Sequence, residues 1–238
     1  MQTQTKDPLY SGKAKSVYAT EHPDQFMMEF RDDVSAFNGV KTAKLSRKGE
    51  INNQFNAFFM EKLEAAGIKT HHIETLSANT SLVKKLEMLP VECVVRNWAA
   101  GSICKRLGLS KGQMLEPPVF EFFLKDDDLG DPMINDSHIA TFGWATASQV
   151  DEMKRLTLAI NGILQPSFKA AGLWLVDYKL EFGVYEGELV LGDEFTPDGC
   201  RIWDSETKEP FDKDRFRQDL GDVVASYEEV ARKLGVPL

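Results

Sequence analysis

LWLVDYKLEFG, residues 173–183, predicts a single long strand whose two faces differ in character. Side chains alternate between the faces of a strand, so Asp177, Lys179 and Glu181 share one face. The apolar residues between them share the other face and predict that it packs against a core. A row of acid, base and acid is typical of a solvated sheet surface or of a site for charged ligands. The strand alone leaves both interpretations open.

The segment that follows predicts a hairpin. ELVLGDE, residues 188–194, has the pattern of a return strand, and 185–187 is the expected loop. A three-residue loop sets Asp193 opposite Lys179, whereas a two-residue loop would turn Asp193 to the other face. The three-residue loop therefore places three carboxylates around one lysine. Because Mg²⁺ prefers one or two carboxylates together with phosphate oxygens, this arrangement favours a magnesium and phosphate site.

Outward from this hairpin, the hydrophobic spacing predicts an α+β protein of antiparallel strands with covering helices. Strands are expected at 9–10, 16–19, 26–30, 71–76, 81–87, 91–96 and 120–124. Helices are expected at 46–67 with Ser46 as the N-cap, at 102–107, at 146–171 and at 216–235. The polar segment 125–137 is expected to be a mobile loop. A hinge at 88–90 would divide the chain into an N-terminal lobe, 1–88, and a C-terminal lobe, 89–238.

Composition argues against several classes of function. The chain has 238 residues, and 28 Lys and Arg against 37 Asp and Glu give a net charge of −9, which disfavours a dedicated nucleic-acid binder. No apolar stretch approaches the roughly 20 residues of a membrane span, and the N-terminus lacks the apolar region of a signal peptide. Three cysteines without a CxxC pair are typical of a cytoplasmic protein. Neither a zinc enzyme nor a serine hydrolase is expected, because HExxH and GxSxG motifs are missing from the sequence.

Two basic segments are candidate anion sites. Arg96 ends a predicted strand and is followed by AAGS, residues 99–102, at the start of a short helix. Such a small-residue turn offers backbone N–H groups to an anion, and Arg96 could clamp it with two hydrogen bonds. GKAK, residues 12–15, is the second segment, although it matches neither the Walker A motif nor the kinase glycine loop. An exposed arginine and a solvated hairpin tip remain the alternatives.

The order of motifs resembles one enzyme family over essentially the whole chain. Five stretches are similar to those of SAICAR synthetases, at 9–15, 35–39, 89–102, 176–183 and 192–198. The resemblance implies a ligase of purine biosynthesis that uses ATP to join L-aspartate to 5-aminoimidazole-4-carboxylate ribotide (CAIR), giving the succinocarboxamide (SAICAR), ADP and phosphate. It also implies a homodimer of two-lobed chains that clasp ATP in the cleft between the lobes, as in kinases and ATP-grasp enzymes.

The resemblance further implies roles for residues on the nucleotide side. ATP would contact Lys13, Ala14, Lys15, Lys84, Leu86 and Met88, with the lysines at 13 and 15 near the phosphates and 86–88 at the adenine. Glu181 and Asp193 would hold Mg²⁺. Lys125 would reach the transferring phosphoryl group and would be catalytic together with Asp177 and Lys179.

On the acceptor side, the resemblance implies that the ribotide phosphate binds to Arg96, Ser102 and Arg201. Asp177 and Lys179 would lie near the base and the ribose. One residue departs from the pattern, since Asn38 stands where some members have aspartate. An amide does not replace the charge of a carboxylate, so a second metal site is in doubt.

Two other functions fit the same residues less well. A kinase would need H-R-D and D-F-G elements, which this sequence lacks. A non-catalytic nucleotide-binding regulator would tolerate the loss of Lys179 or Asp193, yet both are present. Phosphoryl transfer depends on positioning and charge neutralisation more than on a covalent nucleophile. The lysines and carboxylates, without an evident nucleophile, therefore favour activation of a carboxylate by ATP.

Overall fold

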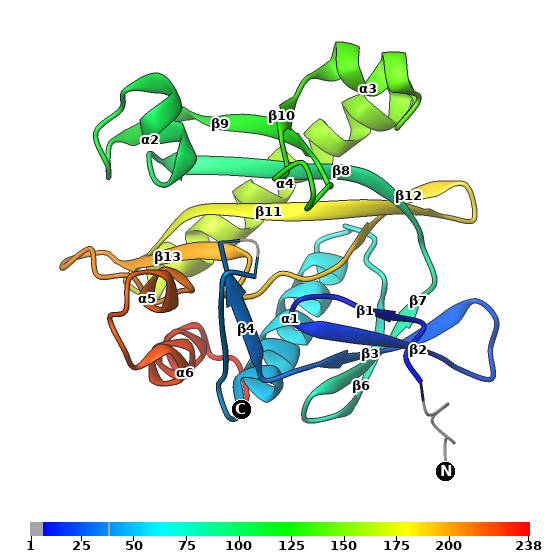
Figure 1. The fold of residues 1–238 in the computed structure, drawn as a ribbon, viewed down its shortest axis with the longest axis horizontal. Coiled ribbons are helices and arrows are strands. Elements are labelled where there is room, and N and C mark those ends of the chain that lie inside the picture. The colour runs from blue at the N-terminus through cyan, green and yellow to red at the C-terminus, as the bar shows by residue number, and fades with distance from the viewer. Residues whose placement is uncertain (1–6, 38) are drawn as a thin grey trace.

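The structure, a computed structural model, describes residues 7–37 and 39–238 and has a mixed fold with antiparallel sheets, as predicted (Figure 1). The first sheet is built from residues before position 85. Its strand order is β1 (Tyr10–Ser11), β2 (Lys15–Ala19), β3 (Gln25–Phe30), β7 (Thr80–Lys84) and β6 (His72–Ser77). A separate hairpin of β4 (Asp33–Ala36) and β5 (Lys41–Lys44), which was not predicted from the sequence, follows β3 along the chain.

The second sheet contains the predicted long strand at its centre. Its order is β10 (Met133–Ile134), β9 (Met114–Leu124), β8 (Glu87–Trp98), β11 (Leu173–Tyr185) and β12 (Glu188–Gly192), and β13 (Cys200–Asp204) pairs with the first half of β11. β11 therefore has a partner along both of its edges. Its alternation is as predicted, since the charged residues at 177, 179 and 181 line one cavity while Tyr178, Leu180 and Phe182 are part of the hydrophobic core.

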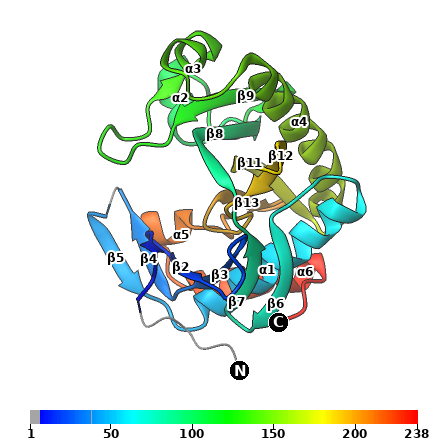
Figure 2. The ribbon, with the colours of Figure 1, turned by 90° about the vertical axis from the view of Figure 1, so that its right-hand side faces the viewer.

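Two long helices, one packed on each sheet, contribute to the same hydrophobic core. α1 (Lys48–Ala65) packs on β3, β6 and β7, and α4 (Ala147–Ala170) packs on β8 and β11 (Figure 2). Phe55 and Phe59 of α1 meet Phe168 of α4 and Phe195 in one aromatic cluster. This cluster joins elements that precede and follow the expected hinge into one hydrophobic core.

The remaining helices are short or lie near the C-terminus. They are α2 (Ser102–Leu107), α3 (Asp136–Phe142), α5 (Asp214–Arg217) and α6 (Val223–Leu234). The predicted helix at 146–171 is confirmed, and Thr146 and Gln149 form a capping box at its start. In the part of the chain that the structure describes, no helix is long and apolar enough to cross a membrane.

The predicted register of the β11–β12 hairpin is wrong. The loop has two residues, Glu186 and Gly187, both with positive φ, as tight hairpin turns require. Tyr185 consequently pairs with Glu188, and Glu181 pairs with Gly192. Position 193 thus falls beyond the end of β12, where strand alternation no longer decides the direction of its side chain.

Several predicted boundaries also differ. The expected C-terminal helix is two helices, because Asp219, Gly221 and Asp222 have positive φ between α5 and α6. The N-cap of α1 is Arg47 and not Ser46. The segment 125–137 is not only loop, since it contains β10 and the start of α3. The strand expected at 81–87 ends at Lys84, and the chain enters β8 at Glu87.

Candidate functional site

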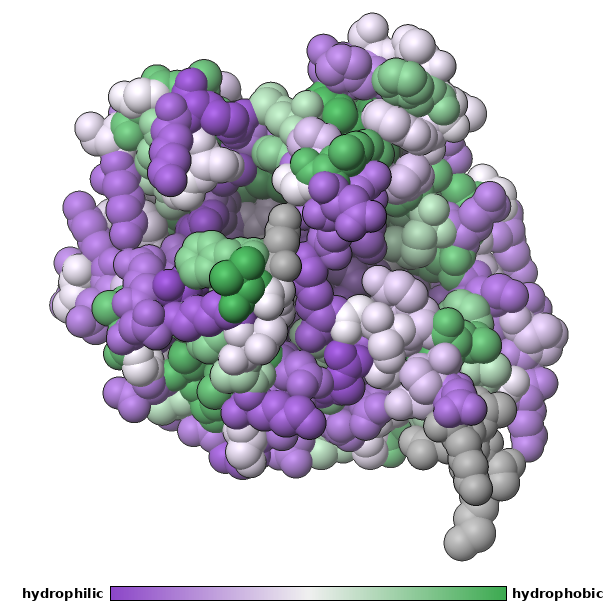
Figure 3. Space-filling view, viewed as in Figure 1, coloured by the Kyte–Doolittle hydropathy of each residue, from purple (hydrophilic) through white to green (hydrophobic). Residues whose placement is uncertain are grey.

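A cavity of about 810 Å³ is lined by residues of both sheets, of β4 and of α5. The corresponding face of the molecule is hollowed, and hydrophilic residues gather around the hollow (Figure 3). Ten of the predicted site residues line the cavity, namely Lys13, Ala14, Lys15, Arg96, Lys125, Asp177, Lys179, Glu181, Asp193 and Arg201. The fold thus brings together segments that are up to 188 positions apart in the sequence, from Lys13 to Arg201.

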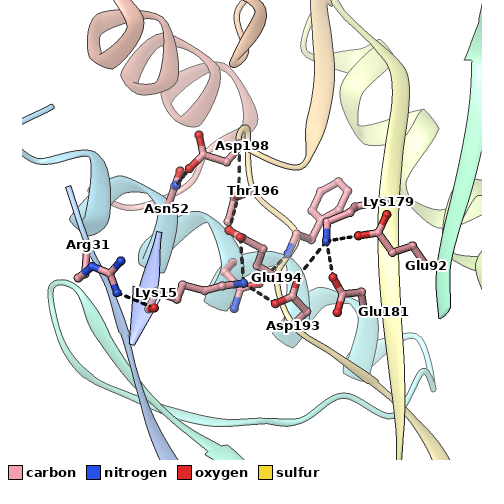
Figure 4. A network of polar contacts seen from close by, with 12 residues as sticks. Lys15, Arg31, Asn52, Glu92, Lys179, Glu181, Asp193, Glu194, Thr196 and Asp198 are labelled. Atoms are coloured by element: carbon pink, nitrogen blue, oxygen red, sulfur yellow. Dashed lines mark hydrogen bonds and ion pairs between the residues drawn. The ribbon is translucent and has the colours of Figure 1, made fainter. Parts of the chain in front are cut away.

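One side of the cavity is a cluster of lysines and carboxylates centred on Lys179 (Figure 4). Its Nζ donates to Glu181 and, over 3.0 Å, to Glu92, and it lies 3.6 Å from an Asp193 oxygen. Lys125 donates to the other oxygen of Glu181. Every charge in this group therefore has a partner of opposite sign.

Lys15 extends the cluster toward the first sheet. Its Nζ pairs with Asp193 and, over 2.9 Å, with Glu194 (Figure 4). Lys13, two residues earlier, pairs with Asp127 over 2.6 Å at the exposed edge. The predicted GKAK segment is therefore part of the cavity wall and not only a solvated hairpin tip.

The electrostatics of the cluster follow from burial and from these pairs. Burial disfavours the charged form of Lys179, but the carboxylates of Glu181, Asp193 and Glu92 raise its pKa well above the ordinary value. Burial likewise opposes ionisation of Asp193, yet the charges of Lys15, Lys179 and Lys125 hold its pKa below the usual range. Burial raises the pKa of Glu92. The ammonium groups and the Asp193 carboxylate are therefore charged at neutral pH.

Glu181 and Asp193 suit a magnesium ion in the chemistry of their oxygens. Both carboxylates contact the same Lys179 ammonium, so they lie on either side of a position where a positive charge is already stabilised. Among residues 7–37 and 39–238, no group of three or more His, Cys, Asp or Glu side chains is placed to hold a metal ion. Two carboxylates are nevertheless the usual protein contribution to Mg²⁺ when phosphate oxygens supply further ligands.

A second cluster, built on two arginines, occupies another part of the cavity. The Asp177 carboxylate accepts from Arg96 over 2.9 Å and from Arg201 over 2.9 and 3.1 Å. Arg96 also donates to Glu121 over 2.7 Å and to the Ser102 hydroxyl over 3.3 Å. The residues that the resemblance connects with a ribotide phosphate are thus held together through Asp177. Two guanidinium groups and a hydroxyl form a typical anion site.

Gly101 leaves room for the Arg201 guanidinium beside the backbone. Its φ of 63° and ψ of −132° are accessible to glycine alone. A Cβ atom at this position would lie 2.6 Å from Nη2 of Arg201. The predicted small-residue turn therefore has a steric purpose, which is to let the Arg201 guanidinium lie against the backbone beside α2.

Four predicted residues do not line this cavity, namely Lys84, Leu86, Met88 and Ser102. Lys84 donates to the Thr70 carbonyl oxygen over 2.8 Å. Leu86 and Met88 lie so close to Gly183 and Gly192 that a Cβ at either glycine would approach them to 3.1 Å or less. Leu86 also borders a second, open pocket of about 470 Å³. Ser102 reaches the first cavity only through Arg96, and Asn38 lies outside the described residues.

Several residues of the wall were not predicted from the sequence, including Glu92, Glu194, Asp198, Lys213 and Arg217. Glu92 lies opposite Glu181 in the pairing of β8 with β11, which no local pattern reveals. Asp198 is buried, and it accepts hydrogen bonds from Lys48, Asn52 and Tyr227 (Figure 4 shows Asn52). Lys48 is fully buried on α1. Helical spacing could have placed this lysine on the buried face of the helix, and a buried lysine predicts a carboxylate partner such as Asp198.

The chain is similar to proteins of one family throughout its length. The family model described as SAICAR synthetase matches residues 8–234. Phosphoribosylaminoimidazole-succinocarboxamide synthase of Hahella chejuensis is 63% identical over 98% of this chain and 99% of its own, and that of Psychrobacter sp. is 61% identical over the full length of both.

Solved structures agree with this result. The crystal structure of the enzyme of the same name from Ehrlichia chaffeensis has a TM-score of 0.95 and 43% identity, covering 98% of this chain and 100% of its own. A SAICAR synthetase solved in complex with ADP has a TM-score of 0.92 and 43% identity, covering 94% and 96%. The chain therefore belongs to the SAICAR synthetase family.

Proposed function

We propose that this cavity carries out the reaction of the family, in which ATP, CAIR and L-aspartate give ADP, phosphate and SAICAR. The observation that carries the proposal is the position of two clusters on one strand. Glu181 and Lys179 belong to the lysine–carboxylate cluster, and Asp177, two residues earlier, holds the paired arginines. A phosphoryl donor and an anionic acceptor bound at the two clusters would be adjacent, as transfer between them requires.

The lysine–carboxylate cluster is the proposed site of the ATP phosphates. Lys13, Ala14 and Lys15 lie on its wall next to Asp193 and Glu194. Phosphate oxygens would replace these carboxylates as partners of the ammonium groups. Mg²⁺ at Glu181 and Asp193 would supply neutralisation of the phosphate charge. We place the adenine at Leu86 and Met88, between two lobes that meet near position 88 and enclose the nucleotide in a cleft.

The arginine cluster is the proposed site of CAIR. Arg96, Arg201 and the Ser102 hydroxyl would bind the ribotide phosphate, since charge-assisted hydrogen bonds from guanidinium groups suit phosphate oxygens. Asp177 and Lys179 would then lie beside the ribose and the base. This orientation directs the CAIR carboxylate toward Lys179 and Lys125, where the transferred phosphoryl group is expected.

The chemistry consists of two displacements. An oxygen of the CAIR carboxylate attacks the terminal phosphorus of ATP and ADP leaves, so the carboxylate becomes an acyl phosphate. The aspartate amine then attacks the acyl carbon, a C–N bond forms, the C–O bond to phosphate breaks and the amine loses a proton. Lys125 and Lys179 neutralise the charge that develops on the transferring group.

The decisive experiment is the dependence of ADP release on each substrate. ADP should form continuously only when CAIR and L-aspartate are both present, and the product should have the mass of SAICAR. A kinase acting on another acceptor would release ADP without aspartate, and a nucleotide-binding regulator would release none. Either of these results would contradict the proposal.

Other expectations from the sequence stay predictions. They are the division of the chain at position 88, the cytoplasmic location and the homodimer. The core is continuous across the proposed boundary, because Phe59 packs against Phe168 and Phe55 packs against Phe195. We therefore expect the two lobes to unfold in a single transition, and sedimentation of the intact chain would test the dimer.

A further inference from the structure

One cation of the cavity wall differs from all the others. Counting partners among residues 7–37 and 39–238, Lys213 is the only lysine or arginine of the wall that has no carboxylate oxygen within 4.0 Å. Its side chain is half-buried, so an unpaired ammonium there is less well solvated than one on the surface. A half-buried ammonium group without a carboxylate partner at a cavity wall indicates that a bound ligand supplies the negative charge.

The groups around Lys213 do not satisfy its charge. Asp198 is the strongest source of negative potential at Lys213, but its oxygens already accept from Lys48, Asn52 and Tyr227. Burial lowers the pKa of Lys213, and the positive charges of Arg217 and Lys48 lower it further, while Asp198 and Glu194 oppose this shift. The local field is therefore favourable to an additional anion.

Arg217 adds a second donor on the same side. It lies four residues after Lys213, one turn along α5, where side chains share a face. Its Nη1 donates to Asp214 over 2.6 Å, and Asp214 also accepts from Arg201 over 3.0 Å. Both Lys213 and Arg217 line the cavity. This pair, Lys213 with Arg217, therefore lies next to the arginine cluster without belonging to it.

The charges of the substrates can be compared with those of the wall. The ATP phosphates have the lysine–carboxylate cluster, and the ribotide phosphate has Arg96 and Arg201. The two carboxylates of L-aspartate are the remaining negative groups, and no residue has been assigned to them. We infer that Lys213, supported by Arg217, binds a carboxylate of L-aspartate and positions its amine toward the activated CAIR carboxylate. This inference rests on the proposed function.

The placement of the pair agrees with the geometry that attack requires. Lys213 lines the same cavity as Glu194, which pairs with Lys15 of the first cluster, and Arg217 is linked through Asp214 to Arg201 of the second. An amino acid held by Lys213 would thus lie between the phosphoryl donor and the ribotide. α5, β4 and β13 lie close together at this end of the cavity in both ribbon views (Figures 1 and 2).

The test is a comparison of Michaelis constants for the three substrates in Lys213→Met and in the intact enzyme. Loss of a charge-assisted hydrogen bond should raise the KM for aspartate about 10- to 150-fold. The KM values for ATP and CAIR should change less than about twofold, and Lys213→Arg should recover most of the aspartate affinity. Lys169→Met is the matched control, because Lys169 is exposed on α4 and outside the cavity wall.

The outcomes separate this inference from the proposed function. Absence of aspartate-dependent ADP release from the intact enzyme and from Lys169→Met would remove the function and the inference together. Normal activity in both, with an unchanged aspartate KM in Lys213→Met, would overturn the inference alone. A rise in the KM for CAIR or ATP in place of that for aspartate would also overturn it.

Chemical modification of the intact enzyme gives a second measurement that does not depend on the folding of a variant. Lys213 should react with acetic anhydride in the presence of ADP and CAIR, and added L-aspartate should reduce its acetylation several-fold. Acetylation of Lys169 should not respond to aspartate. Equal modification of Lys213 with and without aspartate would contradict the inference.

Discussion

Lys179 Nζ lies 3.6 Å from an Asp193 oxygen, although the register of β11 and β12 does not place the two residues opposite each other. Asp193 follows the last residue of β12 and has a φ of 54°, a left-handed value uncommon for residues other than glycine. This turn of the backbone directs its carboxylate to the charged face of β11. A strained residue at a functional site is expected where the surrounding contacts determine its conformation, and here Lys15 and Lys179 provide them.

Glu181→Gln tests the magnesium assignment. The substitution keeps the size of a side chain that is 1% exposed and removes its charge. Because changes around metal ligands alone cost 10- to 100-fold, we expect kcat to fall at least about 100-fold while the protein stays folded. Glu188→Gln is the control, since Glu188 is exposed on the same hairpin and pairs with Lys69 outside the cavity. Near-normal turnover at saturating Mg²⁺ would contradict the assignment.

Arg96→Lys tests the anion assignment. Removal of the whole side chain would break two buried ion pairs and leave Asp177 with Arg201 and Glu121 with Arg106 as their remaining cationic partners. Breaking a buried pair in this way costs about 3–5 kcal/mol of stability. Lysine keeps the charge but loses the planar fork that binds two groups at once. We therefore expect a KM for CAIR raised about 10- to 150-fold, with the KM for ATP nearly unchanged. An effect on ATP alone would show that the two anion sites have been exchanged.

The charged row on β11 could be predicted because strand alternation is a local property. The positions of Asp177, Lys179 and Glu181 required no knowledge of the rest of the chain. The position of Glu92 depends on which strand pairs with β11, and that of Asp193 on the turn after β12. Neither the pairing of distant strands nor the conformation of a single residue produces a repeating pattern of apolar residues, so the sequence alone does not reveal them.

The C-terminal region shows the limit of helical periodicity. Phe216, Leu220 and Val223 continue the spacing of α6, so one helix was expected, yet only Val223 belongs to it. The left-handed residues between α5 and α6 are Asp219, Gly221 and Asp222. The apolar spacing continues through this turn, so the expected helix began at 216. The start of α5, with Lys213 as its N-cap, was therefore missed.

His71 predicts a specific dependence of stability on pH. Burial lowers its pKa from 6.5 to about 3, and among the described residues its Nε2 has no hydrogen-bond partner. The unfolded chain takes up a proton near pH 6.5, whereas the folded chain does not until about pH 3. Folding stability should therefore fall as the pH decreases from 6.5 toward 3, by about 1.4 kcal/mol per pH unit for one proton.

Urea unfolding of His71→Gln across this range checks the prediction. The slope of the unfolding free energy against pH should be shallower than in the intact protein by nearly one proton. His22→Gln is the control, since His22 is exposed, and its slope should match that of the intact protein. The slopes are compared instead of the absolute unfolding free energies, because glutamine also changes the packing around position 71. Equal slopes in the intact protein and His71→Gln would refute the role of His71.

The last prediction concerns the order of the chemical steps. Direct attack of the aspartate amine on a carboxylate would have to expel oxide, which needs an acid to protonate it. Against the opposing effect of burial, Glu181 and Asp193 raise the pKa of Lys179 and of Lys125, so these ammonium groups stay charged and are poor proton donors. Prior phosphorylation replaces oxide with phosphate, a far better leaving group, and uses those same charges to neutralise the phosphoryl oxygens. With ¹⁸O in both carboxylate oxygens of CAIR, one label should pass to inorganic phosphate in each turnover. Hydroxylamine without aspartate should yield a hydroxamate and stoichiometric ADP. Phosphate free of label during normal turnover would eliminate the acyl-phosphate route, whatever the trapping experiment gave.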